Sequence, residues 1–175
     1  MKPSLCIGLV FLTAAVLPGC EGQGKCARGD WCACAGGSEC YQGCVGDGNG
    51  CRFFCSDIDH CGSVCGDDCN MQCDFVKDCQ SYCGDHCHVN CSDSVSCRAL
   101  CGSGCGYTCI NIESCVVRAG AGSTISCFNT AHCMVECTGD CRVFCTDEVG
   151  ECKVTCPNGV SPVSCNDGAV VCGSC

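Results

Sequence analysis

A five-residue motif, Cys-x-h-x-Cys with h usually apolar, occurs twice in every 18 residues of the central part of this chain. It occupies positions 1 to 5 and positions 11 to 15 of each unit. The units begin at Cys51, Cys69, Cys87, Cys105, Ser123 and Cys141, and the last contains one inserted residue. Looser copies start near Asp30 and near Ser161, which makes about eight turns. A fixed period of this kind is typical of a chain built from stacked structural repeats.

The alternation within each motif predicts a short β-strand, because side chains two residues apart lie on the same face of a strand. The two cysteines and h would then point inward, and positions 2 and 4 would point outward. The intervening segments are polar, with Asp or Asn usual at position 7 (Asp57, Asp93, Asn111, Asn129, Asp147) and with Gly and Asp frequent at positions 16 to 18. Such residues favour turns and left-handed backbone conformations. We therefore expect an all-β fold over residues 30–175, a small disulfide-laddered parallel β-solenoid with two short strands per 18-residue coil.

Inward positions 3 and 13 of each coil have complementary sizes. A large residue usually faces a small one, as a narrow and close-packed interior would require. The pairs are Phe53 with Ser63, Met71 with Ser81, Val89 with Ala99, Tyr107 with Val117, Ile125 with Val135, and Val143 with Val154.

The cysteine content and the N-terminus both indicate export. Cysteine makes up 32 of 175 residues, which is typical of a disulfide scaffold in an oxidising compartment. Residues 1–19 combine Lys2 with an apolar run from Leu5 to Leu17 and are predicted to be a signal peptide. The run is too short to span a membrane. Residues 17–20, Leu-Pro-Gly-Cys, resemble a bacterial lipobox, which implies that Cys20 is lipidated and that residues 20–29 begin with a flexible tether, Glu21 to Lys25. The alternative is an ordinary signal peptide with a cysteine at its cleavage site.

The disulfide pairing follows from the one lapse in the pattern, residues 116–125, which contain no cysteine. Ala119 stands at position 15 of one coil and Ser123 at position 1 of the next. If position 15 bonds to position 1 of the following coil, these two replacements remove a single bridge. Pairing positions 1 and 15 within one coil would instead strand Cys105 and Cys137, about two coils apart.

The preferred scheme contains two sets of bridges and pairs every cysteine from Cys26 onward. Across the three-residue turns the pairs are Cys44–Cys51, Cys65–Cys69, Cys83–Cys87, Cys101–Cys105 and Cys137–Cys141. Between positions 5 and 11 they are Cys34–Cys40, Cys55–Cys61, Cys73–Cys79, Cys91–Cys97, Cys109–Cys115, Cys127–Cys133, Cys145–Cys152 and Cys165–Cys172. The remaining four cysteines are assigned to Cys26–Cys32 and Cys156–Cys175.

The spacing of inward cysteines resembles that of the Cys-rich β-solenoid antifreeze proteins of beetles. The resemblance covers most of the mature chain and implies the same coil architecture. Those proteins present a Thr-x-Thr ladder to ice, whereas the outward positions 2 and 4 here run from Arg52 and Phe54 to Arg142 and Phe144 without such a ladder. Ice binding is therefore kept only as a remote alternative.

Metal binding and catalysis fit the residue pattern less well than a structural scaffold does. A thiol-based metal-binding protein is the main alternative, but the cysteine intervals of four, six and seven differ from those of zinc modules. Of the four histidines, His60, His86, His88 and His132, the pair His86 and His88 flanks Cys87 near Asp85 and could hold a metal or act as an acid and base pair. Solvated turn histidines are the simpler interpretation. Residues 46–50, GDGNG, lack the further carboxylates of a calcium loop. Turns of three and five residues leave no cleft for a substrate, so we expect no enzyme activity, no cofactor and no metal.

One surface feature indicates a partner. Val64, Tyr82 and Leu100 share position 14 of successive coils, and Val116 and Met134 share the adjacent position 12, which predicts an apolar stripe for a protein partner or for self-association. A chance cluster of apolar residues is the alternative. The formal net charge of −10 argues against nucleic acid. The sequence thus favours a non-catalytic structural or binding scaffold of the bacterial cell envelope, attached to the outer membrane or cell surface through the lipid on Cys20.

Overall fold

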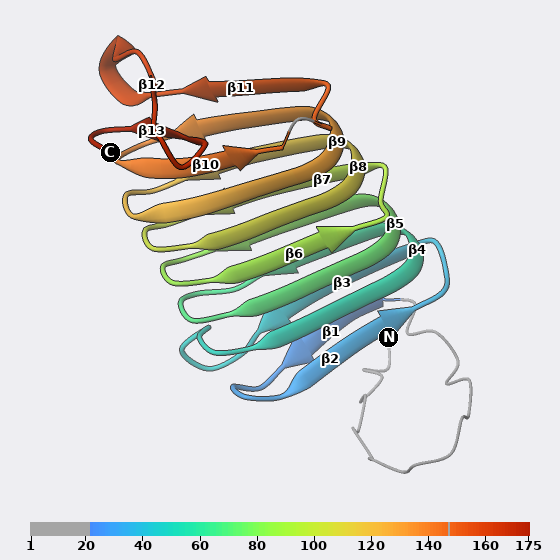
Figure 1. Ribbon diagram of the computed structural model, residues 1–175. Coiled ribbons are helices and arrows are strands. Elements are labelled where there is room, and N and C mark those ends of the chain that lie inside the picture. The colour runs from blue at the N-terminus through green and yellow to red at the C-terminus, as the bar shows by residue number, and fades with distance from the viewer. Residues whose placement is uncertain (1–21, 147) are drawn as a thin grey trace.

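The protein is a parallel β-solenoid of coils spaced by about 18 residues, as the sequence predicts (Figure 1). The computed structural model describes residues 22–146 and 148–175. The predicted signal peptide, Cys20 and Asp147 lie outside these residues. Within the described part of the chain, no helix has the length and apolar character needed to cross a membrane.

Thirteen strands and one short 3-10 helix make up the described fold. They are β1 (Gly22–Cys26), β2 (Trp31–Ala35), β3 (Glu39–Cys44), β4 (Arg52–Val64), β5 (Asn70–Cys83), β6 (His88–Ser92), β7 (Ser96–Cys101), β8 (Gly106–Ala119), β9 (Ser123–Cys137), β10 (Cys141–Cys145), β11 (Glu151–Thr155), η1 (Pro157–Gly159), β12 (Val163–Ser164) and β13 (Ala169–Cys172).

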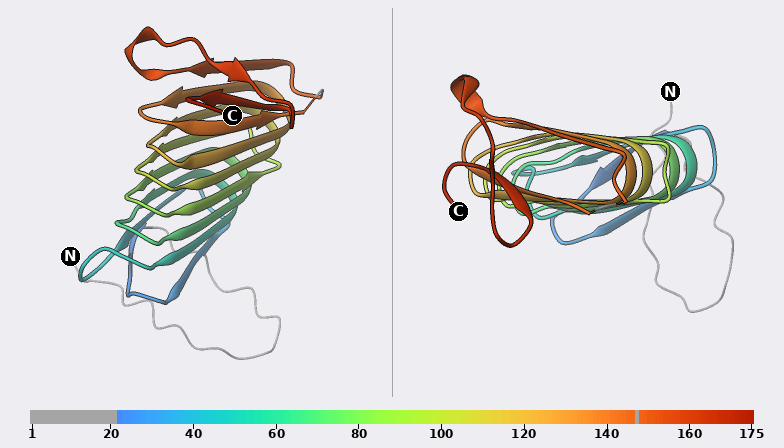
Figure 2. Two further views of the ribbon diagram at one scale, coloured as in Figure 1. Left: turned by 60° about the vertical axis from the view of Figure 1, so that its left-hand side comes forward. Right: turned by 45° about the horizontal axis from the view of Figure 1, so that its top comes forward.

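The coils form two faces that enclose a thin core. The right-hand view in Figure 2 shows the flattened outline of the coils. The first face contains β2, β6, β10 and the N-terminal halves of β4, β5, β8 and β9. The second face contains β1, β3, β7, β11 and the C-terminal halves of those four long strands. Equivalent positions stack in register, so that Cys55 of β4 lies beside Cys73 of β5, and Cys61 lies beside Cys79.

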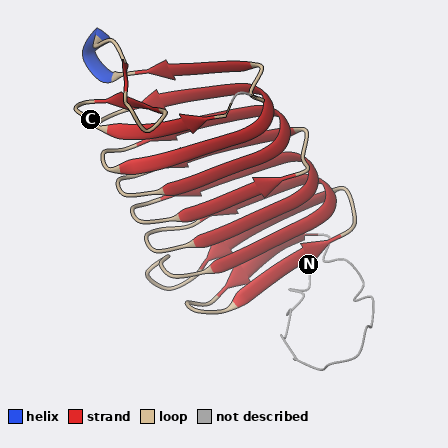
Figure 3. Ribbon diagram, viewed as in Figure 1, coloured by secondary structure: helices blue, strands red, loops and turns tan. Residues whose placement is uncertain are grey.

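The five-residue segments differ from the expected simple turns. In β4, β5, β8 and β9 the strand continues through the segment and bends there (Figure 3). A residue at position 7 with positive φ makes the bend, for example Asn111 at 55° and Asn129 at 44°. Asn tolerates this left-handed conformation better than most residues. The following residue then points inward, and Ile58, Val76, Ser94, Ile112 and Thr130 form a third buried column that the period-two pattern does not predict.

The predicted interior is otherwise found in place. All of the residues assigned to positions 3 and 13, from Phe53 to Val143, are buried. Val154 is only half-buried, because β11 is the last strand of the second face and no further strand covers it. Among the described residues, the core is therefore a single cluster of stacked columns in which apolar side chains alternate with disulfide sulfur.

All 30 cysteines among the described residues form disulfides, and from Cys26 to Cys152 the pairs are those of the preferred scheme. At the lapse in the pattern, Ser123 takes the place of the missing sulfur. The Cys105 N–H donates a hydrogen bond to its hydroxyl at 3.1 Å, and the hydroxyl donates to the Gly102 carbonyl at 3.3 Å. Ala119 and Ser123 are both almost fully buried, so the gap is filled.

The C-terminal pairing is a correction. The bonds are Cys156–Cys172 and Cys165–Cys175, where Cys165–Cys172 and Cys156–Cys175 were predicted. The chain reverses after η1, so β13 runs antiparallel to β10 and places Cys172 beside Cys141. Cys172 thereby lies where position 1 of a following coil would be. Cys156, at position 15 of the last coil, bonds to it as position 15 does elsewhere in the solenoid. The bond between position 15 and the next position 1 is therefore retained, although the strand that supplies Cys172 runs in the opposite direction.

The looser copy near Asp30 is a parallel coil as predicted, but both ends of the chain also differ from prediction. The copy near Ser161 is not an eighth parallel coil, because β12 and β13 form an antiparallel hairpin that covers β10. At the other end, the expected tether is part of the fold. Residues 22–26 form β1 and pair in parallel with β3, with Cys26 opposite Cys44. The free edge of β3 supplies the hydrogen-bonding groups that make an extra strand favourable.

Stacked glycines bring the three-residue turns into close contact. The Gly84 N–H donates to the Gly66 carbonyl and the Gly102 N–H donates to the Gly84 carbonyl, each at 2.9 Å. The Asp85 carboxylate accepts from the Ser103 N–H at 2.6 Å and lies where a Cβ on Gly102 would be. Glycine is therefore required at this position by space.

Candidate binding face

The predicted apolar stripe lies on the second face, as two short columns that meet diagonally. Val64 pairs with Tyr82, and Tyr82 pairs with Leu100. On the next strand the residue beside Leu100 is Arg118, and the apolar residues shift by one column to Val116, which pairs with Met134.

These side chains point into solvent. Val64 is 61% exposed, Tyr82 47%, Leu100 45% and Met134 39%, whereas Val116 is half-buried between its neighbours. Outward positions of a sheet normally carry polar residues when water covers them. Five strands thus contribute one apolar side chain each to a single surface.

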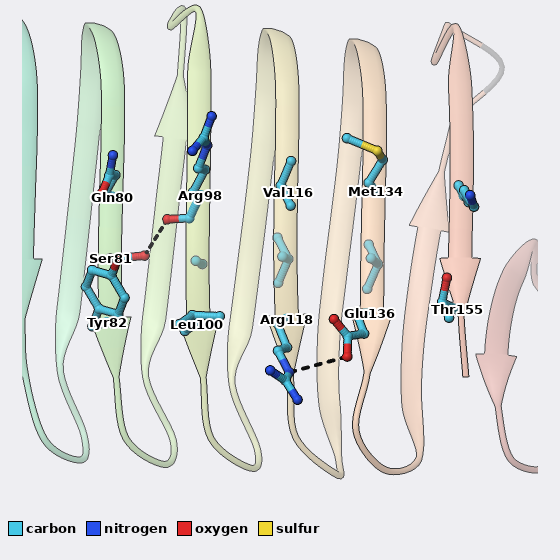
Figure 4. Close-up of a pocket in the computed structure, with 14 residues that line it drawn as sticks. Gln80, Ser81, Tyr82, Arg98, Leu100, Val116, Arg118, Met134, Glu136 and Thr155 are labelled. Carbon is cyan, nitrogen blue, oxygen red and sulfur yellow. Dashed lines mark hydrogen bonds and ion pairs between the residues drawn. The ribbon is translucent and has the colours of Figure 1, made fainter. Parts of the chain in front are cut away.

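Four of the five stripe residues line a shallow groove of about 530 Å³ (Figure 4). The groove crosses β5, β7, β8, β9 and β11, and its floor is formed at Ala99, Val117 and Val135. Val116 is smaller than the residues on either side of it in the same column, Arg98 and Met134, and this size difference hollows the face. Val64 lies outside the groove and lines a neighbouring hollow together with Tyr82 and Leu100.

Charged residues at the groove were not predicted from the sequence. Arg98, Arg118 and Lys153 line it together with a single acidic residue, Glu136. Arg118 Nε lies 3.4 Å from a Glu136 carboxylate oxygen, as the dashed line in Figure 4 shows. Within the described ranges, Arg98 and Lys153 form no ion pair. Reading position 12 down the 18-residue alignment would have placed Arg98 and Lys153 in one column with Val116 and Met134.

The cysteine clusters consist of disulfides and not of free thiols. The Sγ atoms of Cys55, Cys61 and Cys73 lie within 4.8 Å of one another, as do several similar groups. Each belongs to a disulfide stacked on the next one. A thiolate is the form of cysteine that binds metal, and a disulfide sulfur is not a thiolate. In this oxidised state the clusters are structural columns.

The histidines lie apart from the groove. His86 and His88 are exposed at a short turn, and the Asp85 carboxylate beside them is hydrogen-bonded to the Ser103 N–H of the next coil. His132 Nδ1 lies 3.3 Å from Glu151, and His60 Nδ1 lies 3.8 Å from Asp78. These are exposed contacts between neighbouring strands, which contribute little to stability.

The GDGNG segment at residues 46–50 is a turn whose polar groups are already engaged. Asp47 accepts a hydrogen bond from the Asn49 N–H at 3.1 Å and lies 3.3 Å from Arg28. The Asn49 side chain accepts from the Asp67 N–H at 2.7 Å. The segment therefore begins the stack of short turns.

Comparisons with known proteins do not assign a role to this face. No family model matches the chain, and no curated protein and no solved structure matches it. The candidate function therefore depends on the chemistry of the groove itself.

Proposed function

We propose that this protein is an exported, lipid-anchored scaffold of the bacterial cell envelope that presents the second face as a binding surface and has no catalytic activity. The observation that carries the proposal is the combination of a fully disulfide-bonded solenoid with one apolar groove on an otherwise acidic protein. Disulfides in this number require an oxidising compartment. A rigid sheet places the groove side chains without a cost for ordering the backbone on binding.

The position of β1 supports a particular orientation in this proposal. Because β1 begins at Gly22, two residues after Cys20, a lipid on Cys20 would leave almost no tether. The N-terminal end of the solenoid would then rest at the membrane surface, and the coils would rise away from it. The groove, which begins at β5, would face sideways and remain accessible to other envelope proteins.

Two experiments in the native host test the two parts of the proposal. Palmitate labelling of the protein should disappear in Cys20→Ala, and labelling that persists would exclude the anchor at Cys20. Tagged protein and the double variant Tyr82→Asp with Leu100→Asp should then be cross-linked in intact cells. Loss of cross-linked partners from the double variant supports the binding face, whereas an unchanged set of partners excludes it.

A matched control keeps the second experiment specific. Asn90→Asp with Thr108→Asp introduces the same two charges on the outward side of the first face. This control should retain its partners. Far-UV circular dichroism of both variants shows whether the solenoid is intact.

A further inference from the structure

The groove concentrates positive charge on an acidic protein. The chain has 9 Lys and Arg against 19 Asp and Glu. Three of the nine, Arg98, Arg118 and Lys153, line this one groove. The only acidic residue among its lining residues is Glu136, which pairs with Arg118. The local charge of the groove is therefore opposite to that of the protein.

Two of these cations are available to a ligand. Arg28, Lys77 and Arg142 each form an ion pair with an aspartate. Arg98 and Lys153, by contrast, make no ion pair with any residue that the structure describes. Both are exposed at position 12 of the second face, on either side of Val116 and Met134.

The dimensions of the groove match a short extended segment of polypeptide. It crosses five neighbouring strands of the second face, from β5 to β11. At about 4.8 Å between strands this corresponds to roughly 19 Å, the length of about six extended residues. Such a segment would lie across the strands, with apolar side chains against Leu100, Val116 and Met134 and carboxylates near Arg98 and Lys153.

Because the groove is open to solvent, it suits an extended peptide better than a fatty acyl chain or nucleic acid. A fatty acyl chain is usually enclosed by its site over most of its surface, whereas this groove lies on the outside of a single sheet. Nucleic acid would require a continuous basic surface, and the net charge of −10 opposes it. An apolar centre with charged residues around it is the ordinary composition of a protein interface.

We infer that the groove binds an extended acidic peptide segment of a partner protein, in which two carboxylates four residues apart flank an apolar side chain on the same face of the segment. This inference rests on the proposed binding function of the second face and specifies the class of its partner. Unlike charges place the carboxylates at Arg98 and Lys153, while burial of Leu100 and Met134 supplies most of the affinity.

Fluorescence anisotropy with synthetic octapeptides tests the inference. The probe, Ser-Glu-Ser-Leu-Ser-Glu-Ser-Leu, presents glutamate and leucine on the same face of the extended chain, and a control peptide carries lysine in place of glutamate. The acidic peptide should bind the oxidised protein about tenfold more tightly, because two or three exposed charges each contribute about two- to fivefold. Equal binding of the two peptides would contradict the inference.

Variants locate the bound peptide. Arg98→Gln with Lys153→Gln should weaken binding of the acidic peptide several-fold, and Tyr82→Asp with Leu100→Asp should abolish it. Arg52→Gln removes a cation from the opposite face, where Arg52 stacks on Trp31, and should leave binding unchanged. Acidic-peptide affinity that is unaffected by Arg98→Gln with Lys153→Gln would overturn the inference.

The outcomes distinguish the inference from the function on which it rests. If dodecanoate or the basic peptide binds instead, and Tyr82→Asp with Leu100→Asp abolishes that binding, the face is a binding surface but the acidic-peptide inference is wrong. If the groove variants leave the envelope partners unchanged in cells, the proposed function itself fails.

Discussion

Two consecutive short turns of the solenoid differ by one disulfide and share the backbone hydrogen bond between stacked glycines. Cys101 and Cys105 are bonded, with their Cα atoms 6.5 Å apart. One coil further on, Ala119 and Ser123 occupy the equivalent positions. The Gly102 N–H donates to the Gly84 carbonyl at 2.9 Å, and the Gly120 N–H donates to the Gly102 carbonyl at the same distance.

This comparison separates what shapes a turn from what stabilises it. The stacking of the second turn needs no sulfur bridge, because backbone hydrogen bonds and two hydrogen bonds of the Ser123 hydroxyl hold it in place. A disulfide adds stability mainly by restricting the unfolded chain. Close packing at the glycines therefore sets the geometry, and the bridges shift the folding equilibrium.

Reduction of all the disulfides should have the largest effect and should unfold the protein. After residue 20 the chain contains a single leucine, Leu100, and ordering the backbone costs about 1–2 kcal/mol per residue. Far-UV circular dichroism with and without dithiothreitol measures the loss of β structure. A reduced protein that kept its β spectrum and melted cooperatively would show that stacking alone is sufficient.

Gly102→Ala should have the next largest effect, in the turn that has its disulfide. The added Cβ would meet the Asp85 carboxylate and the Gly84 backbone, so we expect a loss of about 2–4 kcal/mol in the free energy of unfolding. Guanidinium denaturation under oxidising conditions measures it. Gly43→Ala is the control, because no atom lies within 4 Å of its new Cβ. Equal stability of the two variants would contradict the packing argument.

Ala119→Cys with Ser123→Cys should give the second turn the disulfide that the first turn has. The new bridge would span four residues, as in Cys101–Cys105, and should raise the free energy of unfolding by about 2 kcal/mol relative to Ser123→Cys alone, which lacks the Ser123 hydroxyl as well. Thiol counting confirms closure, and denaturation midpoints measure the gain against each single variant. Two persistent free thiols would mean that the turn geometry differs from that of its neighbour.

Ser123→Ala should weaken the turn that has no disulfide by about 1–2 kcal/mol. The change leaves the buried Cys105 N–H without its partner at 3.1 Å. Thermal or guanidinium unfolding measures the loss, and Thr124→Ala on the exposed side of the same strand is the control. If both variants match the parent, the hydroxyl does not substitute for the bridge.

Tyr107→Phe should have the smallest effect. The Tyr107 hydroxyl is buried near Ser81 but forms no hydrogen bond of good geometry, and burial raises the pKa of Tyr107 well above its ordinary value, more than the Ser81 side chain lowers it. Removing a buried, unpaired hydroxyl should leave the free energy of unfolding unchanged or raise it by up to about 1 kcal/mol. A loss larger than 1 kcal/mol in guanidinium unfolding would show that the hydroxyl is satisfied.

The 18-residue period determined the solenoid and the inward cysteines, and its one lapse at residues 116–125 determined the disulfides from Cys26 to Cys152. These features follow from local sequence, because each of those bridges closes a short loop and each strand shows its alternation within five residues. The apolar stripe could also be read from the sequence, since side chains 18 residues apart stack in register.

Only the tertiary structure decided the features that depend on chain direction and on combined side-chain sizes. The reversal after η1 brings Cys172 beside Cys141, and no spacing rule specifies a change of direction. The buried column at Ile58 and Val76 exists because a left-handed residue turns the next side chain inward. The 18-residue alignment puts the small Val116 between larger neighbours, but only the structure shows that side chains from five strands line one groove there.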